Sequence, residues 1–167
     1  MSALAGPVDL DELYAASYQR LVVQLFAFCG EMTDAEDAVQ EAFVCAIRRQ
    51  RELAKVHNPE AWLRTVAMNR VRGGWRHAAV IRKYQAAVPG PQEPVEVGPE
   101  HIALVAALSA LDDDQRKIVV LHHLADLGIG DIALELGIPE GTAKSRLARA
   151  RARLATLLRE EEGEHRV

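Results

Sequence analysis

The sequence has few cysteines and no long apolar run. Only Cys29 and Cys45 occur among its 167 residues, and each lies in an apolar stretch, which favours buried free thiols over a disulfide framework. No run approaches the ~20 apolar residues that span a bilayer. The first residues, MSALAGPVDLDEL, lack the basic and apolar parts of a signal peptide. We therefore expect a cytoplasmic protein.

The alternating apolar pattern of β-strands is also absent, as are the common catalytic and metal-binding motifs. Apolar residues recur with the helical period instead, which predicts an all-α fold. Residues 137–145 superficially match a phosphate-binding loop, but Ala143 replaces the glycine needed before the lysine and no strand precedes it. His122 and His123 are adjacent, so on a helix they point about 100° apart and cannot share a metal ion as an i, i+4 pair could. We expect no enzymatic activity, no cofactor and no metal.

The formal net charge of -4 conceals separate acidic and basic blocks. Residues 9–41 hold eight acids and one basic residue, Arg20, whereas residues 61–92 hold six Lys or Arg and no acid. Residues 93–114 again hold six acids and no Lys or Arg, and residues 141–159 hold six basic residues and no acid. Two basic segments separated by an acidic one predict two surfaces that face nucleic acid and at least one other kind of partner.

A helix-turn-helix pattern lies near the C-terminus, at residues 128–158. Gly137 can adopt the left-handed conformation that ends a short first helix, and Pro139 favours the start of a longer second one. The apolar face of the first helix comprises Ile132, Ala133 and Leu136.

The second helix of this motif separates an apolar face from a basic one. At about 100° per residue, the core face comprises Ala143, Leu147, Ala150 and Leu154. The opposite face comprises Thr142, Ser145 and Arg149, flanked by Arg146 and Arg153. Such a face suits DNA that is contacted mainly at phosphates, with a few base edges read by Arg, Lys or Ser. A solvated basic helix would have the same charges, but the preceding turn favours DNA reading.

Two helices are predicted before residue 50. The first has Asp9 and Glu12 as a capping pair and ends at Gly30, and the second starts at a capping box, Thr33 to Glu36. Their apolar faces comprise Leu10, Tyr14, Leu21, Leu25 and Phe28, and Ala35, Ala38, Val39, Ala42, Phe43, Ala46 and Ile47. The other face of the second helix is polar: Asp34, Asp37, Gln40 and Glu41. Spacing alone leaves open whether this acidic face is solvated or contacts a protein.

A third helix is predicted to start at Asn58-Pro59, with the asparagine as its cap. Its buried side comprises Trp62, Leu63, Val66 and Ala67. Basic residues gather toward its end around Trp75 and Tyr84: Arg64, Arg70, Arg72, Arg76, Arg82 and Lys83. Aromatic rings among cations suit single-stranded or distorted DNA. We interpret Trp62 as core, whereas for Trp75, beside Gly73-Gly74, core and base stacking both remain open.

A Pro- and Gly-rich segment, residues 86–99, predicts a linker between two helical domains, residues 9–85 and 100–160. Two more helices, residues 102–111 and 118–124, are expected before the helix-turn-helix, the second of them capped by Asp112 with Gln115 three residues on. The last residues, 160–167, are expected to form a frayed acidic tail.

Three passages resemble those of bacterial RNA polymerase sigma factors of the extracytoplasmic-function (ECF) class, group IV of the sigma-70 family. AEDAVQEAF at 35–43 resembles region 2.2, PEAWLRTVAMNRV at 59–71 resembles regions 2.3 and 2.4, and GIPEGTAKSRLARAR at 137–151 resembles region 4.2. The resemblance covers about residues 10–158. It implies a region 2 domain at 9–85, which binds core polymerase and the minus-10 element, and a region 4 domain at 100–160, which binds the minus-35 element.

The resemblance also implies roles for single residues. Asp37, Gln40 and Glu41 would contact the beta-prime clamp helices of core polymerase, and region 4 the beta flap. A flipped minus-10 base would enter the loop at about residues 53–58, with further minus-10 contacts at Asn58, Arg64, Asn69, Arg70, Arg72, Trp75 and Arg76. The minus-35 contacts would be Lys144, Ser145, Arg146 and Arg149, together with Thr142 and Arg153 from the exposed face.

The linker and the usual regulator of the family add two more expectations. The linker would run toward the polymerase active site and RNA exit path, where Glu93, Glu96 and Glu100 would mimic RNA phosphates or simply be solvated. An anti-sigma protein commonly covers both domains in this family.

The sequence departs from the family pattern at three places. Gly73-Gly74-Trp75-Arg76 stands where Asp-x-x-Arg is common, Met68 where arginine is common, and Ile47 where an aromatic residue is common.

Two other classes of protein remain as alternatives. A LuxR-like regulator that never joins polymerase is opposed by AEDAVQEAF, and a helical adaptor that binds acidic proteins is opposed by the helix-turn-helix spacing.

Overall fold

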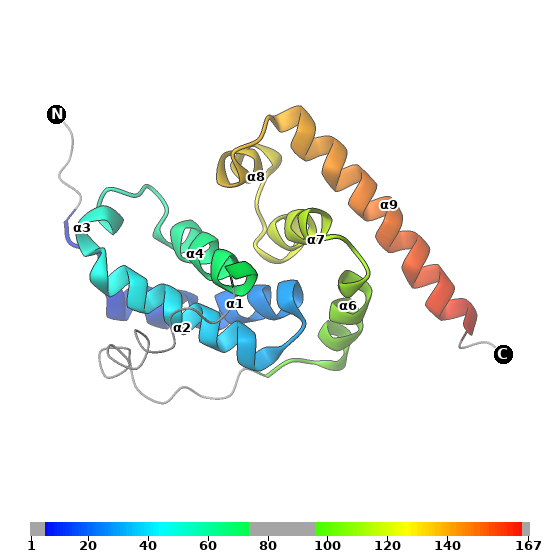
Figure 1. Cartoon of the computed structure of the whole chain (residues 1–167), viewed down its shortest axis with the longest axis horizontal. Coiled ribbons are helices and arrows are strands. Elements are labelled where there is room, and N and C mark those ends of the chain that lie inside the picture. Colours follow the sequence, from blue (N-terminus) through cyan, green and yellow to red (C-terminus); the bar gives the residue numbers. More distant parts are fainter. Residues whose placement is uncertain (1–5, 74–95, 165–167) are drawn as a thin grey trace. The chain divides into compact units, whose positions relative to one another are not determined.

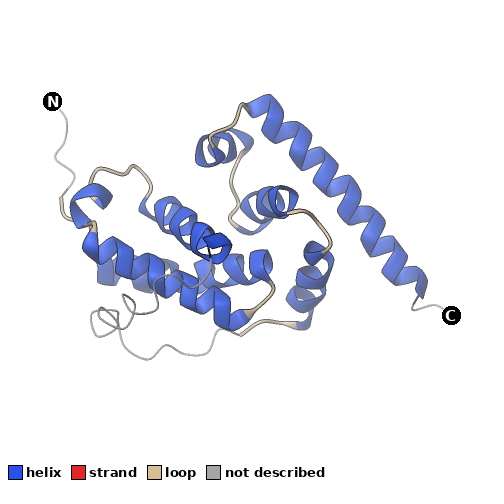
Figure 2. Ribbon diagram, in the orientation of Figure 1, coloured by secondary structure: helices blue, strands red, loops and turns tan. Residues whose placement is uncertain are grey.

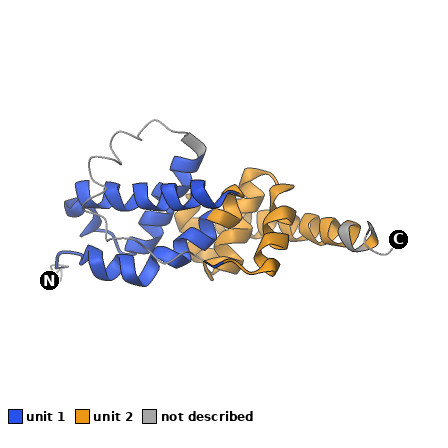
Figure 3. Cartoon of the chain, turned by 90° about the horizontal axis from the view of Figure 1, so that it is seen from below, with its two compact units in different colours: residues 1–25, 31–96 blue, residues 26–30, 97–167 orange. Residues whose placement is uncertain are grey.

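The computed structural model describes residues 6–73 and 96–164, and all the regular elements within those ranges are helices (Figures 1 and 2). The prediction of an all-α fold is therefore confirmed. The helices are α1 (Leu10–Cys29), α2 (Met32–Arg48), α3 (Gln50–Leu53), α4 (Pro59–Gly73), α6 (Pro99–Ser109), α7 (Asp113–Val119), the π-helical turn η2 (Val120–Leu124), α8 (Ile129–Leu136) and α9 (Glu140–Glu164). The chain divides into two compact units, residues 1–25 with 31–96 and residues 26–30 with 97–167 (Figure 3).

Helix α1 begins and ends as the sequence predicts. Oδ1 of Asp9 accepts hydrogen bonds from the backbone N–H groups of Asp11 and Glu12, at 3.0 and 3.1 Å. Gly30 follows the helix with φ of 83°, a left-handed conformation that glycine adopts without steric cost. Within the predicted apolar face, Tyr14, Leu21, Leu25 and Phe28 are buried, and Leu10 is half-buried.

Helix α2 begins before the predicted capping box, so that prediction was wrong. The N-cap is Glu31, whose extended backbone lets its carbonyl accept the first helical bond, from the N–H of Ala35 at 3.0 Å. No side chain caps this end, and Thr33 lies inside the first turn. The predicted apolar stripe is nevertheless correct, because its members are buried except the half-buried Ile47.

Helix α4 packs against α2 in the first unit. Asn58 caps α4 as predicted, since its Oδ1 accepts a hydrogen bond from the N–H of Ala61 at 3.1 Å. Leu63, Ala67 and Met68 are buried on the inner side of the helix, and Trp62 and Val66 are half-buried there. Met68, a departure from the family pattern, is thus a core residue.

In the second unit, α6 begins at Pro99, earlier than the predicted residue 102. Gly98 has an extended backbone at the N-cap, and the fixed φ of proline suits the first turn. Helix α7 has the predicted cap, because Oδ1 of Asp112 accepts from the N–H of Gln115 at 2.8 Å. Arg116 donates to the carbonyl oxygens of Leu108 and Leu111, both at 2.9 Å, and so links α7 to the end of α6 and the turn that follows it.

The helix-turn-helix is formed by α8 and α9, as predicted. Gly137 ends α8 in the left-handed conformation, with φ of 65° and ψ of 36°. In the predicted core faces, Ile132, Ala133, Ala143, Leu147 and Ala150 are buried, and Leu136 and Leu154 are half-buried. The expected frayed tail was wrong for residues 160–164, because α9 continues to Glu164.

Candidate nucleic-acid and protein interfaces

The first turns of α9 present the predicted basic face. Lys144, Arg149 and Arg153 are exposed, and Thr142, Ser145 and Arg146 are half-buried beside them. The hydrophobic side of the same turns is buried against α7 and α8, so the orientation of this face is set by packing in the second unit. The arrangement allows side chains from successive turns to reach one groove of a DNA duplex.

Arg149 and Ser145 interact with each other on this face. Nε of Arg149 donates to the carbonyl oxygen of Ser145, and its Nη2 to the Ser145 hydroxyl, both at 3.3 Å. The hydroxyl in turn donates to the carbonyl oxygen of Thr142 at 3.1 Å. The guanidinium therefore lies along the helix surface next to Ser145, and both polar groups can act on the same part of a ligand.

Arg151, which the sequence analysis did not single out, points toward η2. Its Nε donates to Nε2 of His123 at 3.4 Å. Partial burial lowers the pKa of His123, and the neighbouring charges of His122 and Arg151 lower it further, so the imidazole stays neutral at pH 7 and can accept this bond. Because its side chain is directed toward His123, Arg151 is not one of the predicted DNA contacts of α9.

In the first unit, the structure removes Arg64 from the candidate DNA contacts. Its exposed fraction is 2%, and its Nη1 donates to Oε1 of Gln24 at 3.1 Å within the core. Nη1 also lies 4.0 Å from Oε1 of Glu60, whose carboxylate is held by Arg20 at 3.0 and 2.6 Å. Since Arg64 shares the inward side of α4 with Leu63 and Met68, it is a structural residue.

The other predicted minus-10 residues differ in accessibility. Asn58 and Asn69 are exposed, although Oδ1 of Asn58 is engaged as the helix cap. Arg70 is partly buried and lies close to Glu41, with its Nε 3.2 Å from Oε1 of the carboxylate. Arg72 lies in the last described turn of α4, but its side chain, together with Trp75 and Arg76, lies outside the described residues.

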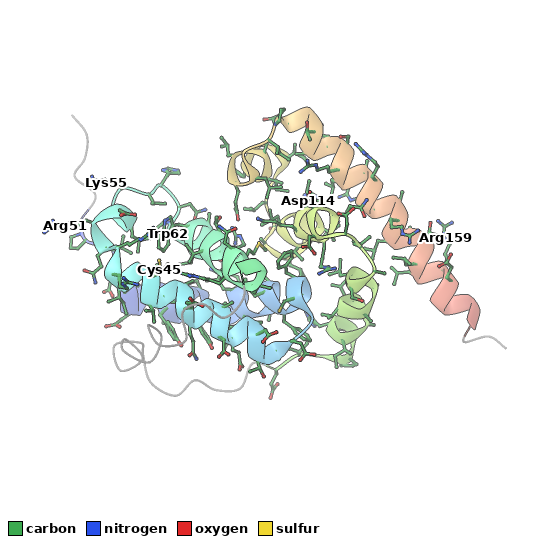
Figure 4. The ribbon with its side chains drawn as sticks, viewed as in Figure 1. Cys45, Arg51, Lys55, Trp62, Asp114 and Arg159 are labelled. Carbon is green, nitrogen blue, oxygen red and sulfur yellow. The ribbon has the colours of Figure 1, made fainter. Side chains whose placement is uncertain are left out.

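An exposed basic cluster, which was not predicted from the sequence, lies at the corner after α2. Its members are Arg48, Arg49, Arg51, Lys55 and His57. Arg49 forms a loose, exposed ion pair with Glu52 at 3.8 Å. Arg51 and Lys55 project from this corner (Figure 4), next to the loop that the resemblance assigns to a flipped base. The signal was present as several cations within ten residues, but no helical periodicity separates them from an ordinary solvated surface.

The acidic face of α2 comprises Asp34, Asp37, Gln40 and Glu41, and these residues differ in exposure. Asp34 is exposed, and Asp37, Gln40 and Glu41 are half-buried. Burial raises the pKa of Asp37, and the nearby charge of Asp34 raises it further. The two carboxylates therefore repel each other on a partly desolvated surface, an arrangement that a basic partner would relieve.

The structure describes only the last residues of the expected acidic linker. Glu93 lies outside the described residues, whereas Glu96 and Glu100 are exposed beside the start of α6.

Among the described residues, no group of histidine, cysteine, aspartate or glutamate could hold a metal ion. The helices of the described part include none that is long and apolar enough to cross a membrane.

Both halves of the chain match known family models. The family model for sigma-70 region 2 matches residues 13–80, and the model for sigma-70 region 4 matches residues 101–154. ECF RNA polymerase sigma factor SigM of Mycobacterium tuberculosis is 36% identical over 154 residues, covering 89% of this chain and 76% of SigM. SigL of the same organism is 32% identical over 138 residues, covering 78% of each chain.

A solved structure shows the same fold. The sigma factor RpoE of Bartonella quintana, crystallised with the anti-sigma factor NepR, matches with a TM-score of 0.70 and 27% identity, covering 90% of this chain and 97% of RpoE. The chain therefore belongs to the ECF class of RNA polymerase sigma factors. The LuxR-like alternative is not favoured, because the region 2 match covers the N-terminal half.

Proposed function

We propose that this sigma factor reads the minus-35 element with α9 and opens the minus-10 element with residues of α4 and the loop before it, after docking on core RNA polymerase. It acts by binding and is not itself an enzyme. The observation that supports this most directly is the exposed basic face of α9 on a packed helix-turn-helix within the region 4 match. The domains assigned to these steps are residues 9–85 and 100–160, joined by the linker at 86–99.

For the minus-35 element, the proposed contacts are Thr142, Lys144, Ser145, Arg146, Arg149 and Arg153. Arginine and lysine can donate to the two acceptors of a guanine edge or to phosphates, whereas the hydroxyls of serine and threonine suit either bases or phosphates. Arg149 and Ser145 lie together and are therefore assigned to one base pair or one phosphate.

For the minus-10 element, the proposed contacts are Asn58, Asn69, Arg70, Arg72, Trp75 and Arg76. Extruding a base costs a few kcal/mol of stacking and pairing energy, which a pocket and backbone contacts must offset. Exposed asparagines at both ends of α4 can hydrogen-bond base edges, and arginines along the helix can bind the backbone. Arg64 is excluded because it is buried.

For polymerase, the proposed contacts are Asp37 and Gln40 on α2, which would meet the beta-prime clamp helices, while region 4 would meet the beta flap. Glu41 was predicted with them from the sequence, but its ion pair with Arg70 sets it apart. Because RpoE is described in complex with an anti-sigma factor, we also propose an anti-sigma protein as a partner of this chain.

Run-off transcription with purified core polymerase and a panel of promoters tests the function. The expected result is a transcript whose start depends on the minus-35 and minus-10 sequences and on addition of the full chain. Gel filtration of the same mixture should show the chain co-eluting with core. Absence of both results would rule out the proposed function.

A further inference from the structure

Glu41 on α2 and Arg70 on α4 form an ion pair across the contact between these helices. Nε of Arg70 lies 3.2 Å from Oε1 of Glu41, and the exposed fractions of the two side chains are 27% and 15%. Oε1 of Glu41 is buried and accepts no hydrogen bond from the described residues. Within that part of the chain, the guanidinium of Arg70 is therefore the cation that compensates the Glu41 carboxylate.

The pairing leaves one edge of the guanidinium for a ligand. Arginine presents five N–H donors in a rigid plane, and the Glu41 carboxylate restrains that plane through its charge beside Nε, without a hydrogen bond. The described residues provide no hydrogen-bond acceptor for these Nη groups. An arginine held in this way loses less side-chain freedom when it binds a phosphate than a freely rotating one does.

Glu41 is also poorly suited to contact a second protein. Its side chain has little exposed surface, and its charge is already compensated. Asp37, one turn earlier on the same helix, differs in charge compensation. It lies beside another carboxylate, and the described residues include no basic partner for it.

We propose that Glu41 is a positioning residue for Arg70 and not a polymerase contact. Its carboxylate holds the guanidinium so that the Nη groups meet the phosphate backbone of single-stranded minus-10 DNA. This inference rests on the proposed function, which supplies that DNA. It reassigns Glu41 from the polymerase-binding surface to the DNA-melting one, although the residue lies on the docking helix.

The test uses holoenzyme assembled from core polymerase and the full chain. Four variants are compared: Glu41→Gln, Arg70→Gln, the double variant, and Glu12→Gln as a matched control. Glu12 is exposed on α1, is not among the proposed DNA or polymerase contacts, and undergoes the same chemical change. Affinity for core is measured first, followed by affinity of the holoenzyme for a fluorescent non-template minus-10 oligonucleotide across a salt series.

We expect Glu41→Gln and Arg70→Gln each to weaken oligonucleotide binding by about tenfold, with the double variant no weaker than Arg70→Gln alone. Each should also reduce the slope of log affinity against log salt by about 0.7, the value for one phosphate contact on a single strand. Affinity for core should stay unchanged in Glu41→Gln, and Glu12→Gln should change neither measurement. Glu41→Asp, which keeps the charge but shortens its reach, should lose part of the oligonucleotide affinity.

Three results would overturn the inference. Weaker core binding by Glu41→Gln with normal DNA binding would make Glu41 a polymerase contact. Tighter DNA binding would show that Glu41 restrains Arg70, and additive losses in the double variant would show independent roles. If Glu41→Gln does not fold, as monitored by circular dichroism, Glu41→Asp decides by the same measurements. A wild-type chain that gives no promoter-dependent transcript would instead refute the proposed function itself.

Discussion

Arg64 on α4 donates to Gln24 on α1 at 3.1 Å, and both side chains are buried. This contact ties α1 to α4, the helix that holds Asn69, Arg70 and Arg72, three of the six proposed minus-10 contacts. Glu60, one turn before Arg64, extends the link through its two-point contact with Arg20. Arg64, Glu60 and Arg20 thus hold α4 against α1.

Replacing Arg64 should destabilise the first unit strongly. Arg64→Ala removes a charged hydrogen bond and the packing of the arginine stem, and it leaves Gln24 unpaired in the core. We expect the free energy of unfolding to fall by about 3 kcal/mol. Arg20→Ala is the matched control, because its partly exposed pair with Glu60 should contribute less than about 1 kcal/mol. Urea unfolding measures both, and equal losses would contradict the assignment.

The turn of the helix-turn-helix should depend on the backbone of Gly137. A side chain in the left-handed conformation is strained, so Gly137→Ala should lower the free energy of unfolding of the second unit by about 1–2 kcal/mol. Gly141→Ala should have the opposite sign. Gly141 lies inside α9 with no atom near its added Cβ, and alanine is preferred there by about 0.5–1 kcal/mol. Thermal unfolding of both variants gives the comparison.

In the protein without polymerase, the Asp37 carboxylate should lower the free energy of unfolding at neutral pH. Burial raises its folded-state pKa above the ordinary 3.8, and Asp34 adds to the rise, so folding favours the protonated form. The favourable contribution is fully present below the unfolded pKa and is lost as the pH rises through the folded one. Asp37→Asn should therefore unfold at higher denaturant than wild type at pH 7. The advantage should shrink as the pH falls through the raised folded pKa and be absent below the ordinary 3.8.

The same substitution should weaken core polymerase binding, because the carboxylate is a proposed docking group. Greater stability with weaker binding is the pattern expected of a residue retained for function. Asp37→Asn with unchanged affinity for core, measured by fluorescence anisotropy, would argue against this docking surface.

Arg149 should contribute to minus-35 selectivity. Arg149→Ala should lose about 1–3 kcal/mol of binding free energy at a cognate minus-35 sequence and discriminate less between base pairs at one position. Arg159→Ala is the control, because Arg159 lies farther along the same helix (Figure 4) and its Nε donates to the carbonyl oxygen of Ala155 at 3.1 Å. Equal loss on every sequence would assign Arg149 to phosphate, and a large effect of Arg159→Ala would enlarge the reading surface.

The sequence by itself determined the helix ends and faces that depend on near neighbours. Asp9, Asn58 and Asp112 accept from N–H groups two or three residues away, so their capping roles follow from local spacing. Gly137 is similar, because its role depends on its own φ. The core faces of α2 and α9 followed from helical period, since packing buries the sides that are continuously apolar.

Only the tertiary structure decided what the charged residues do. Arg64 belongs to a basic block in the sequence, yet its place on the inner side of α4 buries it against Gln24 from another helix. Glu41 and Arg70 were expected on different surfaces, and packing of α2 on α4 joins them. The physical reason is the range of the interaction. A cap or a turn is determined within a few residues, whereas an ion pair between helices exists only after the helices have packed.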